Sequence, residues 1–191
     1  MKKAIIAIAV LLIAAGGSIA AFMSVKSKSD KETKKEESRL SDYVLFDFDA
    51  NSINKVDISC ADGDYTFEYA DEEWSLTEYS DSYFDTNQTA VQGIITFMSY
   101  LQAKDSYGKL TDEAKVKYGL ENPYVVTLSG DSKPYTLYLG KQSPTGEYYY
   151  GYTSEKENVY ALPSSIISNI FVDRLTLKDK DFIPYITSEI V

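Results

Sequence analysis

The sequence predicts an α+β protein, in which an N-terminal transmembrane helix precedes a domain of antiparallel β-sheet with amphipathic helices. Three observations favour this class. An uncharged apolar stretch lies near the start of the chain, 17 tyrosines and 14% aromatic content are typical of pleated surfaces, and short runs of alternating apolar residues recur between turns. The 191 residues leave about 150 for the domain, enough for one fold or two small subdomains.

Composition restricts the chemistry of the chain. It has no histidine and one cysteine, Cys60, which excludes an intramolecular disulfide, a cysteine–histidine dyad, a serine–histidine–aspartate triad and histidine or multi-cysteine zinc sites. Cys60 ends a predicted strand and is interpreted as a small structural residue. We therefore expect no catalytic residues, no metal site and no cofactor.

Charge is spread unevenly along the chain. Residues 1–39 contain eight basic and four acidic residues, a net charge of +4, whereas residues 40–191 sum to −14. An acidic domain repels phosphate backbones, so nucleic-acid binding is not expected. Solubility through like charge is the simplest meaning of the excess.

The N-terminal segment is predicted to be a membrane anchor. Residues 4–25 are apolar and uncharged, and they follow a short tail, residues 1–3, that contains two lysines. As a helix this run would span about 33 Å, against about 30 Å for the hydrocarbon core of a bilayer, so we expect a single pass through the cell membrane. Cleavage as a signal peptide near Ser18 and Ala20 is the alternative. Residues 26–42 are rich in Lys, Glu and Ser and are predicted to be a flexible tether.

Two opposing signals bear on the orientation of this anchor. Two lysines precede the apolar run and six basic residues follow it, which by the positive-inside rule favours a cytoplasmic domain. A lysine pair directly before an apolar run is, however, the arrangement of an export signal, and a cysteine-poor domain rich in Tyr, Ser and Thr suits an extracytoplasmic setting. We expect the C-terminal domain to be extracytoplasmic.

The domain is expected to span residues 43–185, in halves of about 43–110 and 111–185, before a tail at 186–191. A strand at 43–48 opens the first half. Asp47, Asp49 and Asn51 resemble the start of a calcium loop, but Ser52 replaces the required glycine, so side-chain caps of a turn explain these residues better.

A hairpin, a third strand and a helix are predicted next. Alternating apolar residues at 56–59 and 65–69 flank an Asp-Gly turn, and Trp74, the only tryptophan, begins a strand at 74–79 as a core anchor. Asp85 and Thr86 are expected to cap a helix at 88–101. Its apolar stripe should cover one face of the sheet and consists of Val91, Ile94, Ile95, Met98 and Leu101.

The corner at residues 118–123 is predicted to end a helix and lead into a strand. Thr111 caps this short helix, which runs to Tyr118, and Gly119 takes the left-handed cap. Leu120 is expected to fold back onto the core, and Pro123 prevents continuation of the helix. The residues assigned structural roles are therefore Trp74, Tyr118, Gly119, Leu120 and Pro123.

Beyond this corner the order of elements repeats. Strands are predicted at 125–129, 134–139 and 148–153, a helix at 164–171, and a final irregular segment after it. This order suggests two βββα units related by duplication and joined at the corner. The pattern leaves open whether the two halves share one sheet.

A run of tyrosines provides the candidate binding surface. Strand alternation puts Tyr148, Tyr150 and Tyr152 on one face and Tyr149 and Thr153 on the other. One row is expected to pack within the sheet, and the other is available to stack on a sugar or a partner protein.

The second half also resembles a known family. Its features are Tyr118-Gly119-Leu120-x-x-Pro123, the hairpin at 134–140, Ser143-Pro144-x-Gly146, the strand at 148–150, and Val159-Tyr160-Ala161-Leu162. In this order they resemble the bacterial domain-of-unknown-function family 4340, and the resemblance extends over most of 43–185. Members are typically membrane-anchored, and some lie beside or are fused to components of ABC transporters resembling gliding-motility systems. The resemblance implies an accessory extracytoplasmic role and brings no catalytic residues.

Three functions are compatible with these observations. The leading hypothesis is a protein-interaction domain, anchored in the bilayer by residues 4–25, whose partner is a transporter or envelope component. The alternative is a cell-wall or glycan-binding module that uses the exposed tyrosines. The third is a glycosidase with paired carboxylates, but the acids cluster in turns and no spacing selects a pair among Asp47, Asp49, Asp62, Asp64, Asp71, Glu72 and Glu73.

Overall fold

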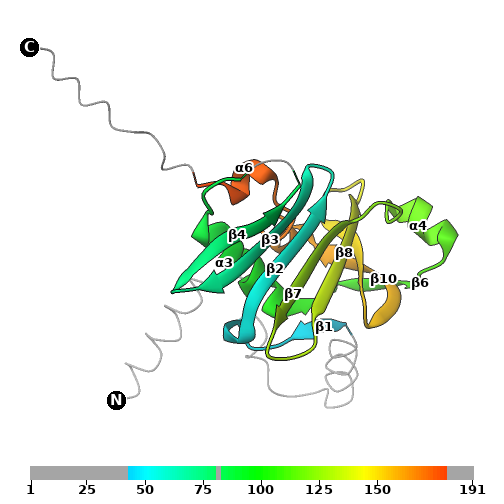
Figure 1. Ribbon diagram of the computed structural model, residues 1–191. Coiled ribbons are helices and arrows are strands. Elements are labelled where there is room, and N and C mark those ends of the chain that lie inside the picture. The colour runs from blue at the N-terminus through cyan, green and yellow to red at the C-terminus, as the bar shows by residue number, and fades with distance from the viewer. Residues whose placement is uncertain (1–42, 81–82, 180–191) are drawn as a thin grey trace, which may run out of the picture. The chain divides into compact units, whose positions relative to one another are not determined.

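One antiparallel sheet of eight strands organises the residues that the computed structural model describes, 43–80 and 83–179 (Figure 1). The strand order is β4-β3-β2-β7-β8-β9-β10-β6. These strands are β2 (Ile53–Cys60), β3 (Gly63–Ala70), β4 (Glu73–Tyr79), β6 (Asp105–Lys109), β7 (Tyr124–Gly130), β8 (Tyr135–Gln142), β9 (Tyr148–Thr153) and β10 (Lys156–Pro163). A separate pair, β1 (Val44–Asp47) and β5 (Tyr100–Gln102), closes one end of the core.

The predicted anchor, tether and C-terminal tail, residues 4–25, 26–42 and 186–191, lie outside the described residues. Among the residues that are described, no helix combines the length and apolar character needed to cross a membrane.

The two halves meet where β2 pairs with β7. Val56 lies opposite Leu128 and Ile58 opposite Val126, and all four side chains are buried. The halves therefore form one sheet, with β3 and β4 following outward on one side and β8 and β9 on the other. The prediction of three strands in each repeated unit is wrong for both halves. β5 and β6 are additional strands in the first half, and β10 adds a fourth strand to the second and itself pairs with β6.

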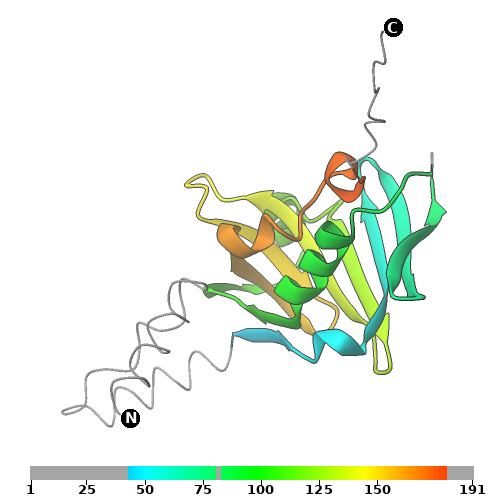
Figure 2. The same ribbon diagram turned by 90° about the vertical axis from the view of Figure 1, so that its left-hand side faces the viewer.

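Helix α3 (Gln88–Ser99) covers one face of the sheet, as the apolar stripe predicted (Figure 2). Val91, Ile94, Ile95 and Met98 are fully buried, and the last member of the stripe, Leu101, is buried in β5. Burying each such side chain contributes about 1.5–3 kcal/mol, so this stripe is a major source of stability.

The start of α3 corrects the predicted caps and explains how the sheet edge is closed. Asn87, rather than Asp85 or Thr86, caps the helix by accepting from the Ala90 amide at 3.2 Å. The Thr86 hydroxyl instead accepts from the Leu76 amide in edge strand β4, at 3.1 Å. This bond covers an amide of the edge strand that would otherwise be open to another chain.

Gln88 covers a second amide of the edge strand, because its side chain binds the backbone of Trp74. It accepts from the Trp74 amide and donates to the Trp74 carbonyl, both at 2.8 Å. The indole of Trp74 is 4% exposed and donates to Gln92 Oε1 at 3.3 Å. Trp74 thus joins the edge strand to α3, in the core position that the sequence indicates.

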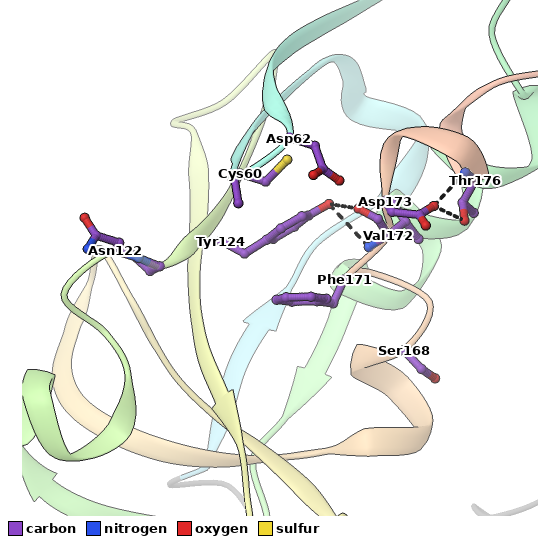
Figure 3. Close-up of a pocket in the computed structure, with 11 residues that line it drawn as sticks. Cys60, Asp62, Asn122, Tyr124, Ser168, Phe171, Val172, Asp173 and Thr176 are labelled. Carbon is purple, nitrogen blue, oxygen red and sulfur yellow. Dashed lines mark hydrogen bonds between the residues drawn. The ribbon is translucent and has the colours of Figure 1, made fainter.

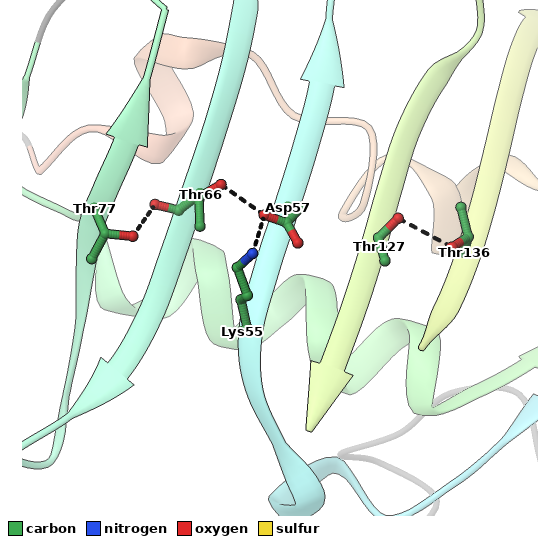
Figure 4. Close-up of polar contacts among 6 residues, drawn as sticks. All are labelled: Lys55, Asp57, Thr66, Thr77, Thr127 and Thr136. Carbon is green, nitrogen blue, oxygen red and sulfur yellow. Dashed lines mark hydrogen bonds and ion pairs between the residues drawn. The ribbon is translucent and has the colours of Figure 1, made fainter. Parts of the chain in front are cut away.

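The face of the sheet away from α3 is polar at its centre (Figure 4). Thr66 Oγ1 donates to Asp57 Oδ1 at 2.7 Å, and Lys55 Nζ lies 3.2 Å from the same oxygen. On the neighbouring strands, the hydroxyls of Thr127 and Thr136 are 3.1 Å apart. These side chains satisfy one another across adjacent strands, as cross-strand pairs commonly do.

The predicted corner forms as a helix stop. Helix α4 (Asp112–Tyr118) begins at Thr111, whose hydroxyl accepts from the Ala114 amide at 3.2 Å. Gly119 adopts the left-handed conformation, with φ of 69°, and the Leu120 amide donates to the Lys115 carbonyl at 2.8 Å. This is the hydrogen bond of a Schellman cap, so the sequence predicts this end of the helix correctly.

The corner packs on the sheet through a second apolar cluster, separate from the one beneath α3. Tyr118 and Leu120 contact Tyr150 and Val159 there. A side chain at Gly140 in β8 would overlap the Tyr118 carbonyl oxygen, so the close approach of the corner to the sheet requires glycine at that position.

The remaining elements differ from the predictions. The helix predicted at 164–171 is regular only over α5 (Ser164–Ile167), where no side chain caps the first turn. Helix α6 (Arg174–Leu177) forms in the segment expected to be irregular, and Asp173 caps it. Strands β5 and β6 lie where no strand was predicted, because both are short and depend on distant partners.

We predict that Gly119→Ala lowers the free energy of unfolding by about 1–2 kcal/mol, because an L-residue is unfavourable in the left-handed region. Its Cβ would also come within 3.2 Å of the Lys141 backbone nitrogen and Cβ. Urea unfolding followed by the fluorescence of Trp74 measures the change, since this is the only tryptophan.

Gly93→Ala is the matched control. Gly93 lies inside α3, and an added Cβ meets nothing within 4 Å. This substitution is expected to raise the stability by about 0.5–1 kcal/mol, because alanine loses less backbone entropy in a helix. Equal effects of the two substitutions would contradict the conformation assigned to Gly119.

Candidate binding site

A pocket of about 490 Å³ opens at one end of the sheet, where three distant chain segments meet (Figure 3). We call it the end pocket. The segments are the end of β2 with its turn, the corner before β7, and the stretch that joins α5 to α6. The lining consists of Cys60, Ala61, Asp62, Asn122, Pro123, Tyr124, Ser168, Phe171, Val172, Asp173 and Thr176.

Two aromatic rings line the pocket. Tyr124 begins β7 and is buried, and its hydroxyl donates to the Val172 carbonyl at 3.1 Å. The ring of Phe171 lies 4.6 Å from that of Tyr124 and 5.6 Å from that of Tyr149, yet 41% of this residue is exposed. Burial raises the pKa of Tyr124 well above its ordinary value, so the hydroxyl stays a neutral donor.

Two carboxylates give the pocket a negative charge. Asp62 lies in the exposed turn after β2. Asp173 is held by its capping role, because its Oδ1 accepts from the Thr176 amide at 2.8 Å and from the Thr176 hydroxyl at 2.7 Å. No Lys or Arg occurs among the described residues that line the pocket.

Cys60 is the only thiol of the chain and forms part of the same wall. It is half-buried, and its Sγ donates to the Gly63 carbonyl at 3.3 Å. Burial raises the pKa of this thiol, and the carboxylates of Asp62 and Asp64 add to the effect. A nucleophilic cysteine requires a lowered pKa, so this environment favours the unreactive, protonated form.

The predicted tyrosine row lies on the face of the sheet away from α3, where it packs in the second apolar cluster with Tyr118 and Leu120. The row consists of Tyr148, Tyr150 and Tyr152. Tyr150 is 8% exposed, and its ring lies 4.5 Å from Tyr118. A ring buried to this extent packs within the sheet, whereas binding of a ligand by this row stays a prediction.

Tyr148 and Tyr152 are half-buried and are also engaged. The Tyr107 hydroxyl donates to that of Tyr148 at 3.0 Å. The ring of Tyr152 stacks on Tyr138, with centroids 4.3 Å apart and planes 3° from parallel. The packing alternative therefore accounts for these two side chains in the structure.

Most of the end pocket is not predicted by the sequence. Cys60 was expected to be structural and Asp62 to be one of many turn acids, and Tyr124 and Phe171 were not expected to form a site. Their positions, near 60, 123 and 171, give no local signal of proximity. Only the pairing of β2 with β7, which sets Ser59 opposite Val125, brings the first two segments together. Of the residues that were given structural roles, Cys60 and Pro123 line this pocket.

The calcium-like residues act as a turn cap. Asp49 Oδ1 accepts from the Asn51 amide at 3.0 Å and begins a short 3₁₀ helix, η2 (Ala50–Ser52). Within residues 43–80 and 83–179, no three His, Cys, Asp or Glu side chains cluster in a way that would hold a metal ion.

The fold and pocket define the class: an α+β domain built on one antiparallel sheet, with a pocket at the end of that sheet. Residues 74–190 match the family described as "Domain of unknown function (DUF4340)". The match covers more than half of the chain, which belongs to this family. It begins at Trp74 in β4, so β1, β2 and β3 precede the matched range. A search of curated proteins found no match, and neither did a search of solved structures.

We predict that the alkylation rate of Cys60 with a neutral reagent increases at a higher pH than the rate of an exposed cysteine does. The raised pKa leaves less thiolate at any given pH. Asp62→Asn removes one charge that raises this pKa, so its alkylation profile is expected to move to lower pH. The measurement is the alkylation rate of the full-length protein across pH. A profile at or below that of a free cysteine would contradict the burial of this thiol.

Proposed function

We propose that this protein is a membrane-anchored, extracytoplasmic protein-interaction domain that serves as an accessory component of an ABC-transporter or envelope complex. The apolar run at 4–25 supports the anchor, and the resemblance to the family supports the accessory role. The end pocket carries the proposal for interaction, because it offers aromatic and acidic groups to another molecule.

The position of the end pocket suits this role. The chain enters the described domain at β1, and β2 then runs along the sheet (Figure 1) to Cys60, which lines the pocket. An eight-residue strand spans about 26 Å, so the pocket opens well away from the point at which the chain enters. A partner is therefore able to approach it without contacting that end of the domain.

The chemistry of the pocket supports binding over catalysis. Its thiol is held in the unreactive form, and the Tyr124 hydroxyl is bound to the backbone of Val172. Asp173 caps α6. These groups fix the shape of the site, whereas a nucleophile or general base must be activated by its neighbours.

Glycan binding through the tyrosines has weaker support. An exposed ring face is the main requirement for stacking on a sugar, and Tyr150 lacks one. Tyr148 and Tyr152 are engaged with Tyr107 and Tyr138. The packing of the row thus favours protein interaction at the end pocket as the main function.

Co-purification tests the proposal. Tagged full-length protein, extracted from membranes in detergent, is expected to bring down subunits of a transporter or envelope complex, identified by mass spectrometry. The double variant Asp62→Asn, Phe171→Leu should lose them by at least about tenfold, because hot-spot residues of an interface dominate its affinity.

Thr77→Ala is the control for this experiment, because Thr77 is exposed on the polar face of β4 and lies outside the end pocket. It should retain the same companions. Recovery of membrane-complex subunits with the double variant at the level of the original protein would exclude the end pocket as the interface. Absence of such subunits from every preparation would contradict the accessory role.

A further inference from the structure

We propose that the end pocket binds the ammonium or guanidinium group of a Lys or Arg side chain that a partner protein presents. The inference deepens the proposed function and rests on it for the partner being a protein. The preference of the pocket for a cation follows from its own residues and is testable without the partner.

Charge is the first argument. Asp62 and Asp173 contribute two carboxylates, and the described lining residues include no basic side chain. Residues 40–191 carry a net charge of −14, so the field of the domain also attracts a basic partner and repels an acidic one. A cation that enters the pocket would be attracted by the exposed carboxylate of Asp62, whereas a neutral ligand would not.

The aromatic surface is the second argument. Phe171 is 41% exposed, although its ring packs against both Tyr124 and Tyr149. Cations bind favourably over such a face, and a site that combines a ring with carboxylates is suited to the head group of Lys or Arg. The apolar stem of the same side chain would lie along the rings.

Size is the third argument. Sites for small ligands occupy about 300–1,000 Å³, and the end pocket falls within this range at about 490 Å³. It accommodates one long side chain together with adjoining backbone. The exposed amide of Asn122 and hydroxyl of Ser168 at its rim are groups to which a peptide backbone can bind.

The single cysteine provides the first test, because Cys60 lies in the pocket wall. Full-length protein is treated with two methanethiosulfonates of similar size, one with a trimethylammonium group and one with a sulfonate. After correction for their rates with a neutral small thiol, the cationic reagent should modify Cys60 on the order of tenfold faster. Asp62→Asn should reduce this ratio about threefold, and high salt should remove most of it. Any change in the thiolate fraction affects both reagents equally and cancels in the ratio.

A cysteine at the other end of the sheet is the matched control. Ser132→Cys in the Cys60→Ser background places the thiol in the exposed turn between β7 and β8, beside both Asp131 and Lys133. Its ratio reports the general field of the domain. A ratio at Cys60 no larger than at this control would overturn the proposal.

Occupancy is tested by protection. A tetra-arginine peptide should slow the modification of Cys60 by neutral methyl methanethiosulfonate, whereas a tetraglutamate peptide should not. Phe171→Leu keeps apolar bulk but removes the aromatic face, so it should weaken the protection by about two- to fivefold. The ratio of charged reagents should change little in this variant, because both carboxylates remain.

The outcomes separate this inference from the proposed function. Protection by a chitin tetramer and none by the arginine peptide would overturn the cation proposal in favour of a glycan. Selectivity for cations without any co-purified membrane complex would support the chemistry of the pocket and contradict the accessory role. A co-purified complex without selectivity for cations would support the accessory role and contradict the cation proposal.

Discussion

The antiparallel pairing of β2 with β7 is the constraint on which the rest of the structure depends. It joins residues about 70 positions apart in the chain, and Val56, Ile58, Val126 and Leu128 are buried along it. Ordering such distant segments costs loop entropy, which the burial of these apolar side chains offsets. The same pairing aligns the end of β2 with the start of β7, so the core and the end pocket have a common origin.

The two faces of the sheet are completed in different ways. Helix α3 covers one face with an apolar stripe, whereas the corner at Tyr118 and the tyrosines of β9 form a smaller cluster on the other. Polar cross-strand pairs occupy the centre of that second face. Packing thereby uses much of the tyrosine content, and Phe171 is left as a partly exposed ring beside the acids of the end pocket.

Local signals predicted the local structure well. The hairpin of β2 and β3, the stripe of α3 and the stop at Gly119 depend on residues close in sequence, and each forms near its predicted place. Strands β5 and β6 depend on distant partners and were not predicted. Strand β10 and the cap of α3 were also missed or misassigned, although β10 pairs with the preceding strand β9 and Asn87 binds the nearby Ala90 amide. The end pocket resembles β5 and β6 in this respect, because its three segments are joined only by tertiary structure. Alternation placed the tyrosines on the correct faces, but the burial of Tyr150 depends on the corner at Tyr118.

Photocrosslinking in cells tests most directly whether the end pocket meets a partner protein. Benzoylphenylalanine is placed at Phe171 in one full-length chain and at Tyr100 in another; these aromatic residues are 41% and 51% exposed, and Tyr100 lies in β5, outside the pocket. The account predicts a discrete crosslink to a transporter or envelope subunit from position 171 and none from position 100. Equal crosslinking from both positions, or none from position 171 while the complex still co-purifies, would contradict it.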